Sequence, residues 1–193
     1  MYINLNKIMF LKICKLFNFW LFVHIPVKRF AKKVNYAFNH VHLFLTLTMF
    51  AFKASFIHES SIAFYALDFL LMNSYKCISK MEKFQYNIHH IFAIFFLSYD
   101  YPLMRHIYFI TELSNIPLAV HHYVNEYFPY QTLKIHYMSG KILWYFYFRC
   151  IYPIHLIPQG ISTLPTYIMV VYFGFYMIGP YHSYTMIKDM INI

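Results

Sequence analysis

Two adjacent histidines, His89 and His90, stand near the start of an apolar segment that runs from residue 86 to residue 100. A buried histidine can take a proton from an attacking hydroxyl or amine, or it can accept an acyl group itself. The carboxylate of Asp68, near the middle of an earlier apolar segment, is predicted to lie within about one helical turn of the pair in depth and can orient one ring. Both rings can equally hydrogen-bond across helices and hold a bundle together. The residue types therefore allow acid–base or nucleophilic chemistry, and they also allow a structural role.

The spacing of the histidines argues against a metal site. Consecutive residues of a helix diverge by about 100°, so His89 and His90 cannot easily chelate one ion together. The twelve histidines include neither the H-x-x-x-H nor the H-x-x-H-H spacing of membrane di-iron oxygenases. The same divergence makes the two rings unequal, and we expect His90 to be the more interior. Three scattered cysteines lack metal-ligand spacing and are expected to be apolar fillers; they are Cys14, Cys77 and Cys150.

A second set of polar residues lies in two later apolar segments, 104–124 and 133–156. Glu112 and Arg149 are both predicted to lie on the order of 12 Å deep from the same side of a membrane, which permits an ion pair that fixes the bundle. At helical spacing the acid shares a face with Asn115 and Ala119, and the base shares one with Lys141, Tyr145 and Tyr152. We expect both faces to line a polar interior, although the amine of Lys141 can instead extend to the cytosolic surface.

The composition predicts that these residues belong to a membrane protein. Hydrophobic residues make up 60% of the 193-residue chain and charged residues only 12%. Soluble domains are roughly half apolar and a quarter charged. A soluble chain of this length cannot bury so much apolar surface, whereas a bilayer can accommodate it. We therefore expect one all-α membrane domain and no second, soluble domain.

Six apolar segments are predicted to form a transmembrane helical bundle; they are 37–57, 61–77, 86–100, 104–124, 133–156 and 164–188. A membrane span needs about 20 residues, so the short second and third segments must tilt or extend into their flanks. Residues 1–33 are expected to form an N-terminal interfacial amphipathic helix and a basic cytosolic segment, with an imperfect seventh span as the alternative. Residues 34–193 then form the membrane domain.

The basic residues predict the orientation of the chain. They lie mostly between the apolar segments, and an N-terminus in the cytosol places nearly all of them on the cytosolic side, with Lys53 and Arg105 as exceptions. Both termini are therefore predicted to be cytosolic, and the 156–163 connection is predicted to be a lumenal loop. The same distribution argues against a nucleic-acid partner despite the net charge of +9.

An ordered set of motifs resembles the TLC family, named for the TRAM, Lag1 and CLN8 proteins. The resemblance covers most of the chain, from about Tyr36 to Met190. Its motifs are NYAFNHVHLFLTL; SSIAFYALDFLLM, with Asp68; NIHHIFAIFFLSY, with the histidine pair; YFITELSNIPL, with Glu112, Ser114 and Asn115; and ILWYFYFRCIYPIHLIP, with Arg149. The segment after the histidine pair lacks the H-D-x-x-D sequence of the ceramide synthase branch. The chain therefore looks closer to the small TLC-domain and CLN8-like branch.

The resemblance implies a multi-pass protein of an endoplasmic-reticulum-type membrane whose partner is a membrane lipid or an acyl chain. It implies lipid sensing, lipid transport or control of membrane lipid composition. The alternative is acyl transfer with acyl-CoA as co-substrate and no resident cofactor, in which His89 or His90 acts as base or nucleophile and Asp68 orients it. In both cases the other motif residues contact lipid or hold the bundle; they are Glu112, Ser114, Asn115, Arg149 and Lys141.

Two further expectations complete the functional interpretation. The third alternative is a trafficking receptor for cargo proteins, and the short loops argue against it. The heavy use of Ile, Lys, Asn, Phe and Tyr is typical of an AT-rich genome, such as that of a protist or a large virus. A viral protein of this kind would reside in a membrane of its host.

Overall fold

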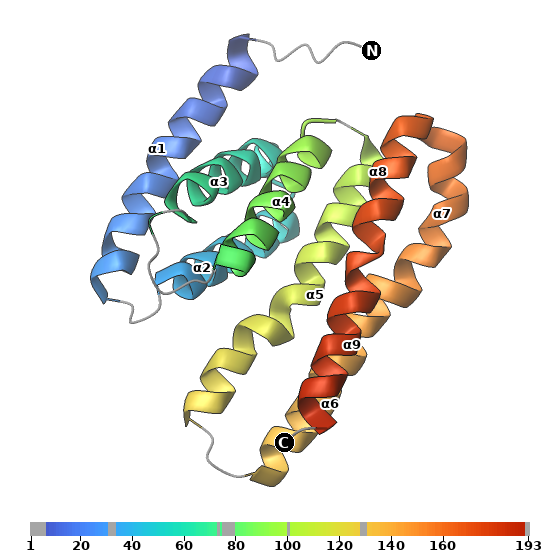
Figure 1. The fold of residues 1–193 in the computed structure, drawn as a ribbon. Coiled ribbons are helices and arrows are strands. Elements are labelled where there is room, and N and C mark those ends of the chain that lie inside the picture. The colour runs from blue at the N-terminus through green and yellow to red at the C-terminus, as the bar shows by residue number, and fades with distance from the viewer. Residues whose placement is uncertain are drawn as a thin grey trace. The chain divides into compact units, whose positions relative to one another are not determined.

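The computed structural model is helical in all regular elements of the residues that it describes, which are 7–30, 34–72, 74, 80–99, 101–127 and 131–191. The predicted all-α fold class is thus confirmed (Figure 1). Three of the basic residues predicted to be cytosolic, Lys32, Lys33 and Lys76, and one of the three cysteines, Cys77, lie outside the described part of the chain.

The chain divides into two compact units, Met1–Arg105 and His106–Ile193. The first unit contains α1 (Lys7–Phe30), α2 (Val34–Ala51), α3 (Ile57–Met72) and α4 (Lys80–Leu97). Helix α5 (Pro102–Tyr127) begins at the end of the first unit and continues into the second. The second unit also contains α6 (Gln131–Phe146), the π-helical segment η1 (Tyr147–Ile151), α7 (Tyr152–Thr163), α8 (Thr166–Tyr176) and α9 (Ile178–Ile191).

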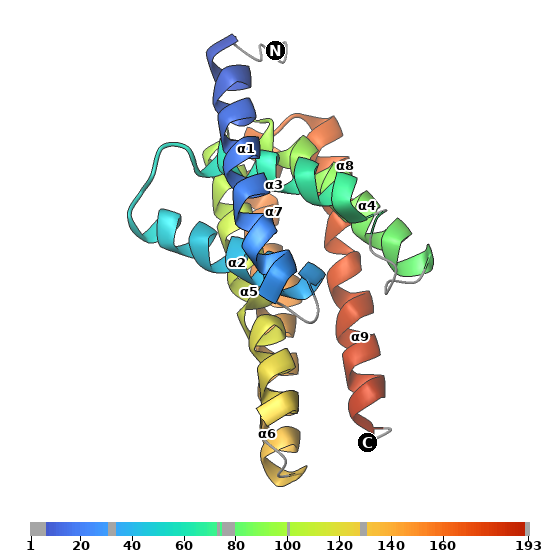
Figure 2. The same cartoon turned by 90° about the vertical axis from the view of Figure 1, so that its left-hand side faces the viewer.

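Helix α3 is the centre of the first unit. It packs against α1, α2 and α4, and most of its side chains are buried, as expected for a helix that is apolar on nearly all faces. Figures 1 and 2 show α1 running beside α3. Ser60, Ser61 and Ala63 are among its buried residues, and such small side chains allow neighbouring helices to approach closely. The tight packing around α3 therefore follows from its sequence.

Trp20 joins α1 to α3. Its ring is fully buried, and its indole N–H donates a hydrogen bond of 2.9 Å to the carbonyl oxygen of Ser60. The rings of Phe38 and Phe64 contact it edge-on, with centroids 5.9 and 5.1 Å away. The predicted domain boundary between residues 33 and 34 therefore separates two helices that pack in one unit.

The rest of α1 is mainly exposed and apolar. Phe22, for example, is 73% exposed. Among the described helices, α1 is the one that is long and apolar enough to cross a membrane, with a span of Met9–Lys28 and a mean hydropathy of 1.4. Helix α1 thus has the length and composition that the spanning alternative requires. Only shorter apolar stretches occur in α2 and α4, Ala37–Ala51 and Tyr86–Leu97, so the six-span bundle stays a prediction.

Each of the last two predicted segments contains more than one helical element in the structure. Segment 133–156 corresponds to the continuous run of α6, η1 and α7, and segment 164–188 corresponds to α8 and α9. The expected loop at 156–163 is wrong, because α7 continues to Thr163. The chain turns instead at Leu164, whose backbone is extended. The following proline, Pro165, disfavours helical geometry at the residue before it, which explains where α7 ends.

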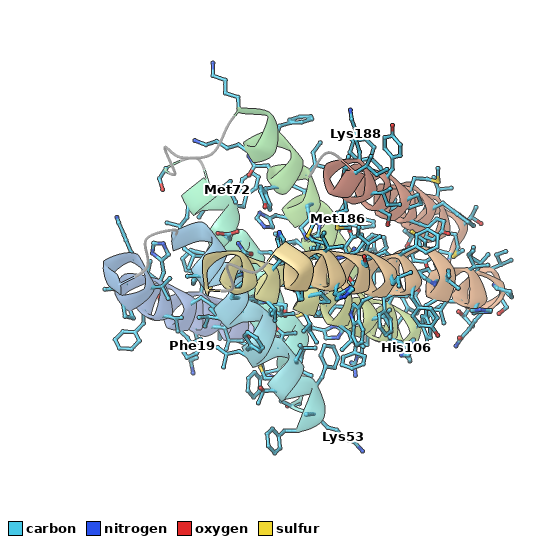
Figure 3. The ribbon with its side chains drawn as sticks, turned by 90° about the horizontal axis from the view of Figure 1, so that it is seen from below. Phe19, Lys53, Met72, His106, Met186 and Lys188 are labelled. Atoms are coloured by element: carbon cyan, nitrogen blue, oxygen red, sulfur yellow. The ribbon has the colours of Figure 1, made fainter. Side chains whose placement is uncertain are left out.

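Two exposed lysines mark the outer parts of their units. Lys53 follows α2 in a turn with a φ of 51°, and Figure 3 shows this turn at the outer edge of its unit. Lys188 lies in the last turn of α9 and is also exposed.

Candidate functional site

The first unit contains a buried contact between Asp68 on α3 and His90 on α4. Nε2 of His90 lies 3.3 Å from Oδ2 of Asp68. His90 is 1% exposed and Asp68 is 0% exposed. Helices α3 and α4 pack against each other, which brings together two residues that are 22 positions apart in the sequence. The expected proximity of the aspartate to the histidine pair is thus confirmed.

The two histidines are unequal, as the helical period predicts. His90 is buried, whereas His89 is half-buried. The ring of Tyr65 lies near both, with centroids 5.4 Å from His90 and 6.0 Å from His89. His90 is therefore the interior residue of the pair and the one in contact with the carboxylate.

Helix α2 adds polar residues that the sequence analysis did not select. His42 is buried, its Nε2 lies 3.2 Å from Oγ1 of Thr46, and its ring stacks on Phe64 at 3.7 Å. The amide of Asn39 lies beside the carboxyl group of Asp68. These three α2 residues are spaced i, i+3 and i+7, so they share one helical face. This spacing was the signal available in the sequence.

Several polar atoms around this contact lack hydrogen bonds within the described residues. They are both carboxyl oxygens of Asp68, Nδ1 of His90 and the amide oxygen of Asn87, which precedes His90 by three residues on α4. The 3.3 Å contact itself lacks hydrogen-bond alignment. Buried polar atoms are normally hydrogen-bonded, and leaving one unpaired costs about 1–3 kcal/mol. We call Asp68, Asn87 and His90 together the Asp68–His90 site.

The chemistry of the Asp68–His90 site is that of a hydrogen-bond acceptor. Carboxylate and amide oxygens accept hydrogen bonds, and Nδ1 of histidine accepts one when Nε2 carries the proton. With Nε2–H toward Asp68, Nδ1 is the basic nitrogen and can remove a proton from a bound hydroxyl or amine. The site is therefore suited to a ligand that presents hydrogen-bond donors.

Arg149 is the centre of a separate polar cluster in the second unit. Its Nε donates to Oγ of Ser114 at 2.7 Å, and its Nη2 donates to Oδ1 of Asn115 at 3.1 Å and to the carbonyl of Thr111 at 3.4 Å. Its guanidinium also lies over the ring of Tyr145, 5.5 Å from the centroid. The structure thus brings together three of the predicted residues, Arg149, Ser114 and Asn115.

The expected ion pair between Glu112 and Arg149 is not among the contacts that the structure gives Arg149. Thr111, Ser114 and Asn115 follow the i, i+3, i+4 spacing of one helical face, and this face of α5 meets the guanidinium. Glu112 is buried but lies about 100° around the helix from Thr111. Depth along a helix can be counted from the sequence, whereas the rotation that decides which face meets a partner depends on packing.

The predicted interior faces in the second unit are confirmed by burial. Glu112, Ala119 and Tyr145 are buried, and Asn115, Arg149 and Tyr152 are half-buried. Lys141 is also buried, so its side chain does not extend to the surface. These polar faces point inward, as the helical period indicated.

Side chains of α6 donate hydrogen bonds to backbone carbonyls of α5 around Pro117. Pro117 has no N–H, so the carbonyl of Leu113, four residues earlier, loses its helical donor. The indole N–H of Trp144 on α6 donates to that carbonyl at 3.0 Å. The hydroxyl of Tyr137, also on α6, donates a second hydrogen bond, to the carbonyl of Pro117. These bonds link α6 to α5 around the proline.

Neither site has the composition of a metal centre. Among the described residues, no group of three or more His, Cys, Asp or Glu side chains is arranged to hold a metal ion. Comparison with protein-family models, with curated proteins and with solved structures finds no match for the chain. Function therefore has to be inferred from the two polar clusters and from the surface around them.

Proposed function

We propose that the protein is a multi-pass membrane protein of the TLC type that binds a lipid or an acyl chain of an endoplasmic-reticulum-type membrane. The observation that carries this proposal is the Asp68–His90 site, which keeps unpaired hydrogen-bond acceptors in the interior of a largely apolar helical unit. Its ligand presents a hydroxyl, an amine or an amide N–H to these acceptors.

The surroundings of the site favour an amphiphile over a small polar ligand. Aromatic residues of α3 adjoin the polar atoms, with Tyr65 against His90 and Phe64 against His42. Binding sites for amphiphilic molecules combine a few placed polar groups with mainly apolar and aromatic walls. A lipid head with a donor group and an apolar chain matches this combination.

The surface supports a membrane environment. Large apolar side chains are exposed on helices of both units, including Phe22 on α1, Leu70 on α3, Leu143 on α6 and Val170 on α8. Soluble monomers rarely expose extended apolar surface. In a bilayer these side chains contact lipid, and α1 has the length and hydropathy of a span.

Acyl transfer is the second candidate function, and the geometry of His90 favours it. The base Nδ1 removes a proton from a bound hydroxyl or amine as that group attacks the carbonyl carbon of an acyl-CoA thioester. A carbon–oxygen or carbon–nitrogen bond forms, the carbon–sulfur bond breaks, and the coenzyme A thiolate leaves and takes up the proton. Asp68, 3.3 Å from Nε2, stabilises the imidazolium between these steps.

Native mass spectrometry of the full-length protein purified in a neutral detergent tests the proposal. We expect a co-purified lipid with wild type, and a large loss of that lipid with Asp68→Asn and with His90→Gln. His89→Gln is the matched control, because His89 is adjacent on the same helix but only half-buried. Equal lipid retention by all three variants would refute the site assignment.

The same preparations separate binding from catalysis. Incubation with acyl-CoA and a long-chain amine or alcohol yields an amide or ester, together with free coenzyme A, if the protein is a transferase. In that case His90→Gln abolishes turnover while His89→Gln retains most of it. Lipid retention without any release of coenzyme A would support binding alone.

A further inference from the structure

The guanidinium of Arg149 retains hydrogen-bonding capacity in the second unit. The described hydrogen bonds engage Nε and Nη2, and all of them go to neutral groups. The two N–H groups of Nη1 have no described hydrogen bond, and Arg149 forms no ion pair with a described acid. An arginine stays protonated in proteins. Arg149 therefore presents a positive charge and two donors that its described neighbours do not use.

A pocket adjoins this charge, and its other walls are mainly apolar. Arg149 and Thr111 line it together with Ile107, Ile110, Leu156 and Tyr172. Its two tyrosine hydroxyls point to backbone, since Tyr172 donates to the carbonyl of Pro153 at 3.5 Å and Tyr176 donates to that of Cys150 at 2.7 Å. Arg149 is thus the charged group of the lining, and apart from Thr111 the other named walls are apolar or aromatic.

Local backbone geometry fixes Arg149 at this position. It lies within the π-helical segment η1, and such segments are frequent at functional sites. Gly179 of α9 lines the same pocket and contacts the backbone of Arg149 so closely that a Cβ there would lie 2.8 Å from the Arg149 carbonyl oxygen. The guanidinium is therefore held by three hydrogen-bond acceptors on α5, and its backbone is held by α9.

We infer that this Arg149 pocket, with a volume of about 30 Å³, binds the anionic head of an amphiphile, a carboxylate or a phosphate, through Nη1 of Arg149, with the apolar tail extending out of the pocket. Charge-assisted hydrogen bonds from arginine to these oxyanions are among the strongest in proteins. The chemistry is opposite to that of the Asp68–His90 site, which needs donors. The inference relies on the proposed lipid function only for the apolar tail.

The test compares ligands that share a tail and differ in the head. Full-length wild-type protein in a neutral maltoside detergent is titrated with oleate, with oleyl lysophosphatidate and with oleyl alcohol, and also with inorganic phosphate. We expect at least one anionic lipid to bind about tenfold or more tightly than oleyl alcohol, as one charge-assisted hydrogen bond implies. A preference for oleate assigns a carboxylate head, and a preference for the lysophosphatidate assigns a phosphate head.

Variants locate the preference. Arg149→Gln is expected to reduce the preference for the anionic head to less than about twofold, and Arg149→Lys, which keeps the charge, to retain part of it. Lys53→Gln, which removes an exposed positive charge from the first unit, is the control and is expected to leave the preference unchanged. Binding of inorganic phosphate as tightly as lysophosphatidate would assign a free-anion site and overturn the role of the tail.

Two outcomes would overturn the inference altogether. The first is that wild-type protein binds oleyl alcohol as tightly as both anionic lipids. This outcome needs no variant, so it overturns the inference even if Arg149→Gln fails to fold. The second is that folded Arg149→Gln prefers the anionic head as strongly as wild type does. A preference that depends on Arg149, in a protein that purifies without lipid at the Asp68–His90 site, would support this pocket and refute the proposed function.

Discussion

Adding one methyl group at Gly179 is predicted to destabilise the second unit. An ideal Cβ at this position would lie 2.8 Å from the carbonyl oxygen of Arg149 and 3.0 Å from its Cβ. Real Cβ atoms essentially never approach so closely, and the nearest atom belongs to the backbone, which cannot rotate away. Helix α9 or η1 must therefore move. Overpacking of this kind costs about 1–3 kcal/mol, so Gly179→Ala should lower the free energy of unfolding by that amount.

Gly140 supplies a matched control for the same substitution. It lies inside α6, and an added Cβ would meet nothing within 4 Å. Replacing an exposed glycine in a helix by alanine stabilises by about 0.5–1 kcal/mol, because alanine restricts the unfolded chain and favours helix. Gly140→Ala should therefore raise stability. The two substitutions differ in position only, and their effects should have opposite signs.

The assay is reversible unfolding of the full-length protein in mixed micelles, followed by the loss of helical circular dichroism. Oleate binding is measured on the same samples, because a shift of η1 also moves the guanidinium of Arg149. Gly179→Ala that is as stable as Gly140→Ala would refute the close approach of α9 to η1. Gly179→Ala that is destabilised but binds oleate like wild type would separate this packing from the Arg149 pocket.

Three further substitutions test other contacts. Trp144→Phe should lower the free energy of unfolding by about 0.5–1.5 kcal/mol, because it removes the donor to the Leu113 carbonyl. Part of this loss should disappear in a Pro117→Ala background, where the backbone N–H returns. Equal losses in both backgrounds would contradict the compensation. The double variant Asp68→Leu/His90→Leu should be as stable as wild type or more stable, with a gain of up to about 4 kcal/mol in the free energy of unfolding. It should nevertheless purify without lipid. A strong loss of folded protein would instead assign the pair a structural role. Lys80 and Ser162 are both exposed, so each can be replaced by a single cysteine in a chain whose native cysteines have been removed. In sealed microsomes the cysteine at position 80 should react with a label on the cytosolic side and the cysteine at position 162 on the opposite side. Labelling of both from one side would refute the predicted topology.

The helical period predicted the interior residues well. Counting positions along two apolar segments was enough to place Asp68 close to the histidine pair, and the divergence of adjacent residues was enough to select His90 as the interior one. Burial of Glu112 followed from the face it shares with Asn115 and Ala119, whereas the sequence left Lys141 open between the interior and the cytosolic surface. These predictions needed only the geometry of single helices.

Features that depend on two helices were less accessible. Arg149 contacts Ser114 and Asn115 because a particular face of α5 meets η1, and the axial count that suggested Glu112 carries no information on that rotation. The donor from Trp144 to Leu113 could be sought once Pro117 was known to leave a carbonyl unpaired, but its identity depends on the packing of α6. The contribution of α2 was missed, although Asn39, His42 and Thr46 share one helical face.

Side-chain donors satisfy several backbone carbonyls of the second unit. In the second unit, backbone groups next to prolines and the π-helical turn receive side-chain donors: Trp144 for Leu113, Tyr137 for Pro117 and Tyr176 for Cys150. A buried polar residue whose only role is to hold helices together is expected to be satisfied in the same way.

Asp68, Asn87 and His90 do not follow that pattern, because each keeps a buried polar atom without a hydrogen bond in the described structure. Each such atom costs about 1–3 kcal/mol, which a leucine or phenylalanine at the same position would avoid. An arrangement that lowers stability is consistent with selection for an interaction made only when a ligand is bound. A lipid head that donates hydrogen bonds would satisfy these atoms, so ligand binding should stabilise the first unit, and the double leucine variant should lose that stabilisation while gaining intrinsic stability.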